Sequence, residues 1–214
     1  MADKKTTEVV EKILEESKKL DRKFKQNIDL VINLKNIDLN NPKNRIDQEV
    51  VLPHGRGNLA KIALFASGEL AVKAKDLVDF LIKPEDIEEF SKNKKNFKKI
   101  ADEHDFFIAE APLMPTIGRT LGTILGPRGK MPKPVPPNAD LTGLTKNLRN
   151  SVKIRTKGSK TVQTIAGNVD MPKEHIADNI DAIIKRLESL LEKGRMDIGS
   201  VYVKTTMGPP GRIL

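Results

Sequence analysis

The sequence contains no cysteine and no tryptophan, and it has one tyrosine among 214 residues. Without cysteine the chain forms no disulfide, offers no thiolate nucleophile and builds no cysteine-ligated zinc or iron site. It also lacks the apolar segment of a signal peptide and any apolar run near the roughly 20 residues that a membrane helix requires. We therefore expect a cytoplasmic protein that is neither secreted nor embedded in a membrane.

Acidic residues are scarce in one part of the chain. The whole sequence has 38 Lys and Arg against 29 Asp and Glu, a formal charge of +9, and its 38% hydrophobic residues suffice for a packed core. Between positions 111 and 169 the only acid is Asp140, against ten basic residues. This excess favours a polyanionic partner, although a solvated basic surface would produce the same composition.

Aromatic residues make up only 4% of the sequence, which argues against a single-strand binder that stacks bases on aromatic side chains. Folded RNA is recognised by its shape, its phosphates and its 2′-hydroxyl groups, and it fits this composition better. DNA stays open as a partner, but the sequence shows no zinc-finger or basic-zipper pattern.

Both ends of the chain combine helix and strand patterns. Apolar spacing predicts a helix over 6–20, and alternation predicts a strand over 28–34 and a short one near 49–52. Towards the other end, strands are predicted over 152–156, 161–166 and 200–207, with a long helix over 172–192. The first 60 residues hold too few elements to close a core, so we expect 1–60 and 151–214 to form one α+β domain of the split β-α-β type.

Residues 61–150 alternate between strand and helix patterns, including single helices predicted over 84–104 and 115–125. Such alternation is typical of a parallel sheet with helices on both faces, so we expect an inserted α/β domain with a Rossmann-like three-layer fold. The chain then crosses twice between domains, which suggests a hinge. Gly55 and Gly57 would supply backbone freedom at the first crossing, and Asn150 lies at the second.

The sequence gives no support for catalysis, a metal or a cofactor. The stretch 55–60 has the letters of a dinucleotide fingerprint but precedes a predicted strand, and 126–131 is too short for a phosphate loop. The three histidines show no metal-ligand spacing. An enzyme that binds a nucleotide in the inserted α/β domain is the alternative to an RNA-binding protein.

Residues 125–138 hold five prolines, two glycines and the bases Arg128, Lys130 and Lys133. This proline content predicts neither helix nor central strand. Two interpretations stay open: a stiff surface loop, or a preorganised basic arm that meets phosphates with little loss of conformational entropy.

The same segment, LGPRGKMPKPVPPNADL, resembles the signature of the L-one family of large-subunit ribosomal proteins in its archaeal form. Three further segments agree with that family, namely 22–24, 51–57 and 200–209, so the resemblance covers essentially the whole chain in order. It implies a non-enzymatic protein with two domains, the first built from both chain ends.

The resemblance also implies partners. Members of the family form the lateral stalk beside the tRNA exit site, bind large-subunit rRNA, help to discharge deacylated tRNA and commonly repress their own operon by binding a leader mRNA. For this chain it implies large-subunit rRNA, exit-site tRNA and own-operon mRNA as partners of a protein that is monomeric when free.

Carried over by motif, the expected RNA-binding residues precede the first strand and lie on and after the last: Lys23, Phe24, Ser200, Thr206, Met207 and Gly208. Ser200 and Thr206 are an even number of positions apart, which would put both hydroxyls on one strand face. Gly208 would let the RNA backbone approach closely. We add Arg155 and Lys157 to the RNA surface, and Arg128, Lys130 and Lys133 as candidate contacts with tRNA or rRNA.

Overall fold

The computed structural model describes residues 4–19, 22–39, 41, 44–137, 139–156 and 158–214. It divides into two compact units: unit 1 comprises Met1–Leu59 and Asn150–Leu214, and unit 2 comprises Ala60–Arg149. The expected mixed α and β structure with several sheets is confirmed. The domain limits expected from the sequence differ from these units by one residue at each crossing.

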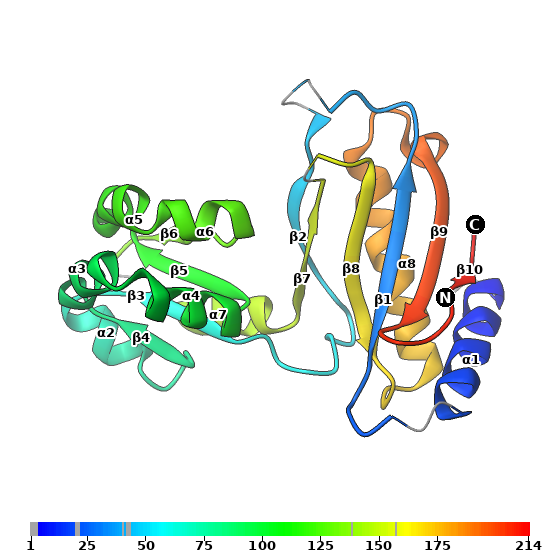
Figure 1. Ribbon diagram of the computed structural model, residues 1–214, viewed down its shortest axis with the longest axis horizontal. Helices are drawn as coiled ribbons and strands as arrows, with labels where there is room; N and C mark the ends of the chain where they lie inside the picture. The colour runs from blue at the N-terminus through cyan, green and yellow to red at the C-terminus, as the bar shows by residue number, and fades with distance from the viewer. Residues whose placement is uncertain (1–3, 20–21, 40, 42–43, 138, 157) are drawn as a thin grey trace. The chain divides into compact units, whose positions relative to one another are not determined.

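Unit 1 is built on a four-stranded antiparallel sheet in the order β10-β9-β1-β8. The strands are β1 (Asn27–Leu34), β8 (Thr161–Asn168), β9 (Ile198–Thr205) and β10 (Gly211–Arg212). Every second residue of β1 is buried, from Ile28 to Leu34. This apolar face packs on α1 (Lys4–Lys19) and α8 (Lys173–Leu190), and Figure 1 shows α8 behind the sheet.

A second, two-stranded sheet in unit 1 pairs β2 (Asp47–Val51) with β7 (Ser151–Arg155) in antiparallel fashion. β2 precedes the crossing into unit 2, and β7 follows the crossing back into unit 1. β7 also contacts β8 of the larger sheet. A 3-10 turn, η3 (Gly194–Asp197), leads from α8 into β9. The apolar residues of both sheets and both helices form one core.

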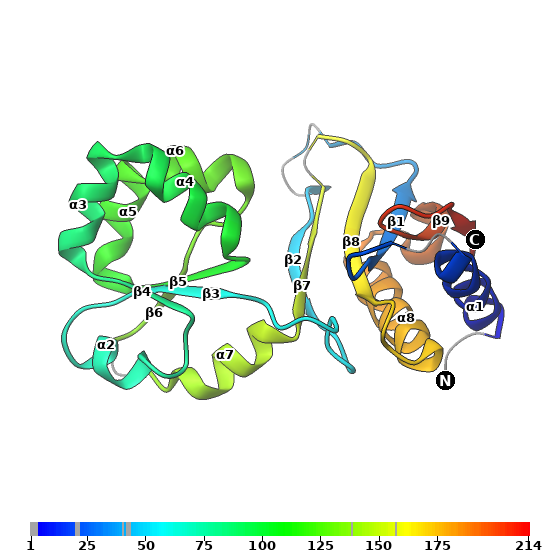
Figure 2. The ribbon, with the colours of Figure 1, turned by 60° about the horizontal axis from the view of Figure 1, so that its bottom comes forward.

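Unit 2 is a parallel sheet in the order β4-β3-β5-β6 with helices on both faces (Figure 2). Its strands are β3 (Ile62–Phe65), β4 (Phe80–Ile82), β5 (Phe106–Glu110) and β6 (Lys133–Val135). One face is covered by α2 (Gly68–Ala74) and α7 (Leu141–Arg149). The other is covered by α3 (Pro84–Lys92), α4 (Lys94–Glu103), α5 (Met114–Thr120) and α6 (Gly122–Arg128), with the 3-10 turn η2 (Ala111–Leu113) before α5.

Three local predictions were wrong: two expected helices are each divided in two, and the proline-rich segment begins inside a helix. The helix expected over 84–104 is two helices, because the backbone of Asn93 leaves the helical region at φ −111° and ψ 62°. The helix expected over 115–125 is likewise divided, into α5 and α6.

The proline-rich segment also forms regular structure, since α6 continues to Arg128 and β6 pairs with β5. Proline has no N–H to continue the helical hydrogen bonds, and α6 ends one residue after Pro127, at Arg128. Pro134 lies on an edge strand.

Candidate nucleic-acid interface

The face of the four-stranded sheet turned away from α1 and α8 carries mostly polar side chains in rows, and we call it the open face. The strand register places three residues in each row: Thr161, Asn33 and Ser200; Gln163, Val31 and Tyr202; Ile165, Asp29 and Lys204. All are exposed or half-buried, while the residues between them are mostly buried. In Figure 1 this face looks toward the viewer.

The first row is joined by hydrogen bonds. The Thr161 hydroxyl donates to Asn33 Oδ1 at 3.0 Å, and Asn33 Nδ2 donates to Ser200 Oγ at 2.9 Å. These bonds fix the orientation of the Asn33 amide. Because Ser200 acts as the acceptor, its own hydroxyl hydrogen can point to another acceptor, such as a phosphate or ribose oxygen.

The third row carries both signs of charge. Burial raises the pKa of the Asp29 carboxyl, and the nearby Lys204 ammonium acts in the opposite direction. A carboxyl whose pKa is higher in the folded than in the unfolded state disfavours folding while it is ionised.

Asp29→Asn is therefore expected to raise the free energy of unfolding at pH 7, and this gain should shrink as the pH falls through the pKa of the carboxyl. Urea unfolding of both proteins at pH 7 and near pH 3 measures it. A variant less stable than the wild type at pH 7 would show that the attraction between Asp29 and Lys204 outweighs the burial penalty.

At one end of the open face, the chain before β1 meets the turn after β9. We call Phe24, Gln26, Thr206, Met207 and Gly208 the end cluster. Gln26 is buried and joins the two segments, because its Oε1 accepts a hydrogen bond from the Met207 backbone N–H at 3.0 Å. Phe24 and Met207 remain 51% and 55% exposed, an unusual exposure for large apolar side chains.

A surface hollow of about 400 Å³ adjoins Phe24. Its lining includes Lys18, Arg22, Lys23 and Lys25, with Asp170 as the only acid among the described residues that line it. Lys25 pairs with Asp170 at 2.9 Å, an exposed ion pair of little strength. The hollow thus combines exposed apolar surface with an excess of positive charge.

The structure changes the roles expected for Thr206 and Gly208. β9 ends at Thr205, and the Thr206 hydroxyl accepts a hydrogen bond from Asn27 N–H at 3.1 Å, so it closes the end of the sheet. Gly208 folds back in a turn in which its N–H donates to Thr205 O at 3.1 Å. A Cβ at position 208 would collide with Thr205 Oγ1. The turn itself thus favours glycine here, and the close approach of RNA expected at this position stays a prediction.

The other expected contacts lie apart from the end cluster. Arg155 is on β7 and pairs with Asp47 at 3.5 Å. Lys157 lies outside the described residues. In unit 2, Arg128 Nε donates to Asp102 at 2.8 Å, and Lys130 Nζ donates to two carbonyls at the end of α4. Lys133 is on β6. Arg128 and Lys130 therefore hold α4 in place, and the contact of this segment with tRNA or rRNA stays a prediction.

The first crossing is held firmly to unit 1. The buried Asn179 on α8 donates to Gly55 O at 2.7 Å and to Ala166 O at 2.9 Å, and it accepts from His54 N–H at 3.2 Å. Gly55 and Gly57 both have positive φ, and a Cβ on Gly57 would collide with Asn168. Their backbone conformation accounts for glycine at both positions without a hinge.

The second crossing is paired with the first. Asn150 O accepts a hydrogen bond from Leu52 N–H at 3.0 Å inside unit 1, and Ala60 N–H donates to Arg149 O at 3.3 Å inside unit 2. The two crossings are therefore hydrogen-bonded to each other on both sides of the boundary between the units.

Unit 2 has the sheet order of nucleotide-binding folds, in which ligands bind at the carboxyl ends of the strands where the order reverses. Here that point lies after β3 and β5, and Glu110 occupies it. Its Oε2 accepts hydrogen bonds from Ser67 N–H at 2.9 Å and Ser67 Oγ at 2.7 Å, and the side chain is 7% exposed. A carboxylate at this place repels phosphate, which argues against the nucleotide-binding alternative.

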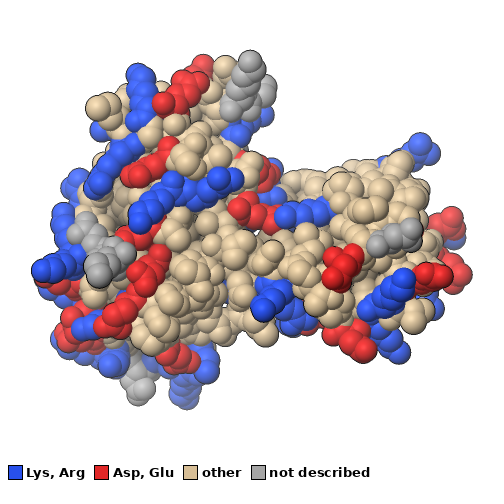
Figure 3. Space-filling model, turned by 180° about the vertical axis from the view of Figure 1, so that it is seen from behind, with Lys and Arg blue, Asp and Glu red and all other residues tan. Residues whose placement is uncertain are grey.

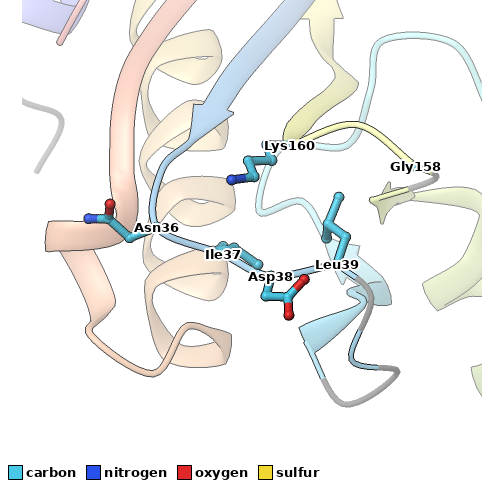
Figure 4. A pocket seen from close by; sticks show the side chains of 6 residues that line it. All are labelled: Asn36, Ile37, Asp38, Leu39, Gly158 and Lys160. Carbon is cyan, nitrogen blue, oxygen red and sulfur yellow. The ribbon is translucent and has the colours of Figure 1, made fainter.

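A second hollow, of about 470 Å³, lies beyond the other end of the open face (Figure 4). It is lined by residues 36–39, Gly158 and Lys160. Lys160 directly precedes Thr161, so it adds a cation next to the first row of the open face. The helix-covered side of unit 1, seen in Figure 3, shows basic and acidic side chains interspersed.

Within the part of the chain that the structure describes, no group of three histidine or acidic side chains is arranged to hold a metal ion. Every helix described is too short or too polar to span a lipid bilayer.

Comparisons with known proteins agree on one family. The family model described as "Ribosomal protein L1p/L10e family" matches residues 13–209. The chain is 51% identical over 215 residues to the "Large ribosomal subunit protein uL1" of Methanocella arvoryzae, covering 100% of both chains. It is 52% identical over 194 residues to the protein of that name from Methanothrix thermoacetophila, covering 90% of this chain and 92% of the relative. A third relative of the same name, from Thermoplasma volcanium, is 50% identical over 187 residues and covers 87% and 86%.

Proposed function

The chain belongs to the ribosomal protein L1p/L10e family, and from this premise we propose that the open face and the end cluster of unit 1 form its binding site for large-subunit ribosomal RNA. Its relatives are archaeal proteins of the large subunit of the cytoplasmic ribosome, and the family is not enzymatic. Binding of rRNA is general for the family. The proposal concerns where and how this chain binds it.

The observation that carries the proposal is the hydrogen-bonded row of Thr161, Asn33 and Ser200. Hydroxyl and amide groups both donate and accept, which suits ribose 2′-hydroxyl groups and phosphate oxygens on the surface of folded RNA. The row is held by bonds within the protein, so little side-chain entropy is lost when RNA binds. Tyr202, the only tyrosine, lies in the adjacent row and offers one aromatic surface.

Charge at the two ends of the open face supports the same interpretation. The hollow beside Phe24 carries Arg22, Lys23 and Lys25, and the hollow at the other end carries Lys160. Between them the charge of Asp29 is balanced by Lys204. RNA on this surface would contact cations at both ends and hydrogen-bonding groups between them, which gives specificity with a moderate dependence on salt.

Ser200→Ala is expected to weaken binding of a stalk fragment of large-subunit rRNA about five- to tenfold, the effect of one lost hydrogen bond. Because no cation is removed, the slope of log affinity against log salt should not change. Ser189→Ala, an exposed serine on α8, is the matched control and should bind like the wild type. Equal losses in the two variants would show that the open face is not the binding site.

From the family resemblance we also propose the finer activities: the protein helps to form the lateral stalk beside the tRNA exit site, assists release of deacylated tRNA, and represses its own operon by binding leader mRNA. In this mechanism unit 1 stays on the rRNA, while unit 2 turns about the two crossings to follow the tRNA.

If one face serves both rRNA and mRNA, the two RNAs should compete for the protein, and Ser200→Ala should weaken the binding of both. Simultaneous binding of both would contradict this.

A further inference from the structure

Helix α4 of unit 2 places four lysines on its exposed side, and we call Lys94, Lys95, Lys98 and Lys99 the lysine face. Phe97 and Ala101 are fully buried and set the rotation of the helix. The four lysines fall into two rows, 94 with 98 and 95 with 99, and the members of each row are four positions apart in the sequence. Such neighbours have Cβ atoms about 5–6 Å apart.

The stability of α4 does not account for these lysines. Positive charge is unfavourable near a helix N-terminus and favourable near a C-terminus. The preceding helix α3 follows this rule, with Glu85 and Asp86 in its first turn and Lys92 in its last. In α4 the order is inverted at both ends, since lysines begin the helix and Asp102 and Glu103 end it. A partner with negative charge would offset this cost.

Nearby acids neutralise the lysine face only in part, since Asp102 interacts electrostatically with Lys98 but is hydrogen-bonded to Arg128. Asp102 is engaged by Arg128 at 2.8 Å, a hydrogen bond that lowers the pKa of this carboxyl. Lys130 adds a further cation at the end of α4. The remaining exposed carboxylates close in sequence are Glu88, Glu89 and Glu103. Over the described residues, no carboxylate forms an ion pair with any of the four lysines.

We propose that the lysine face of α4 is a second RNA contact, which binds the phosphates of double-helical RNA without reading the sequence. Neither α3 nor α4 carries an exposed large apolar side chain in the described structure. A membrane-binding helix needs an apolar face, and a stable protein interface has an apolar or aromatic centre. A purely cationic surface matches a nucleic-acid backbone instead. This inference does not depend on the open face.

The test compares two triple variants of the full chain on a 24-base-pair RNA duplex of arbitrary sequence. Lys94→Gln, Lys95→Gln and Lys98→Gln remove three charges from the lysine face. Lys73→Gln, Lys75→Gln and Lys146→Gln remove three exposed charges on or beside α2 and α7, which cover the opposite face of the sheet (Figure 2). Glutamine keeps a helix propensity similar to that of lysine.

The first triple variant is expected to bind the duplex about tenfold more weakly at 0.1 M salt, and its slope of log affinity against log salt should fall by about 2 to 3, because each lost phosphate contact contributes roughly 0.7–0.9. The control should change the slope by less than one. The melting temperature of the lysine-face variant should not fall below that of the wild type, since it removes unfavourable positive charges from the start of α4.

Equal losses in the two triple variants would mean a response to net charge alone and would overturn the proposal. So would undiminished duplex binding by the first variant. If polyglutamate or anionic vesicles bind through these lysines while the duplex does not, the partner is not RNA and the proposal fails. Binding of the stalk rRNA fragment, measured in parallel with Ser200→Ala, reports the open face separately, so failure of one site is distinguished from failure of the other.

Discussion

Gly208→Ala is expected to weaken binding of the stalk rRNA fragment by about 100-fold, equivalent to about 2.7 kcal/mol. The added Cβ collides with Thr205 Oγ1, so the turn after β9 has to open. Opening it moves Met207, whose backbone N–H is bonded to Gln26, and thereby separates the two halves of the end cluster. Filter binding or calorimetry at constant salt measures the loss.

The double variant Thr205→Ala with Gly208→Ala is the matched control, because it removes the atom that the new Cβ meets. Thr205 Oγ1 is buried and has no hydrogen-bond partner among the described residues, so removing it breaks no bond. The nearest remaining contact would be Thr205 Cβ at 3.5 Å, an ordinary van der Waals distance. We expect the double variant to recover most of the affinity. Continued weak binding would mean that Gly208 is needed for direct approach of RNA.

Asn179→Ala is expected to lower the free energy of unfolding of unit 1 by about 3 kcal/mol. The side chain is fully buried and makes three hydrogen bonds, to His54 N–H, Gly55 O and Ala166 O. Alanine leaves the buried Gly55 O and Ala166 O and the part-buried His54 N–H without this partner, at a cost of about 1–3 kcal/mol for each buried group that finds no substitute. Urea unfolding followed by tyrosine fluorescence reports unit 1 alone, because Tyr202 is the only tyrosine and no tryptophan is present.

Ser189→Ala, at an exposed serine on α8 of unit 1, is the control and should change stability by less than about 0.5 kcal/mol. Amide exchange over residues 52–58 should also accelerate in the Asn179 variant, because that side chain holds the first crossing against α8. An Asn179 variant as stable as the control would show that water replaces the lost bonds.

The sequence predicts the elements with strong periodicity and misses the features that depend on single residues. The alternation along β1 predicts both a strand and its two faces. The break at Asn93 and the two-residue strand β10 leave no periodic signal. Pro127 misleads, because α6 includes this proline and ends only one residue later, at Arg128.

The candidate site was predicted only in part, because hydrogen bonds between distant segments of the chain assemble it. Gln26, Asn33 and Thr161 were missed, although the polar positions of β1 indicated an exposed face. Their hydrogen-bond partners lie 128 to 181 positions away in the chain: Gln26 pairs with Met207, and Asn33 pairs with both Ser200 and Thr161. Only strand register brings such residues together, and register between distant segments is not readable from one sequence. The partners of Arg128 and Lys130, on and just after α4, lie 26 to 29 positions away, and no pattern in the sequence indicates these bonds.

The position of β1 between β8 and β9 also fixes the order in which a nascent chain acquires its parts. Unit 2 is complete once residue 149 has been made, whereas β1 waits for partners at 161–168 and 198–205. At about 5–20 residues per second, the last of these partners follows unit 2 by about 3 to 11 s. The open face therefore forms only after residue 205 has been made, so a shorter nascent chain is unable to occupy an RNA site, and any product truncated before β9 leaves β1 with an unpaired edge.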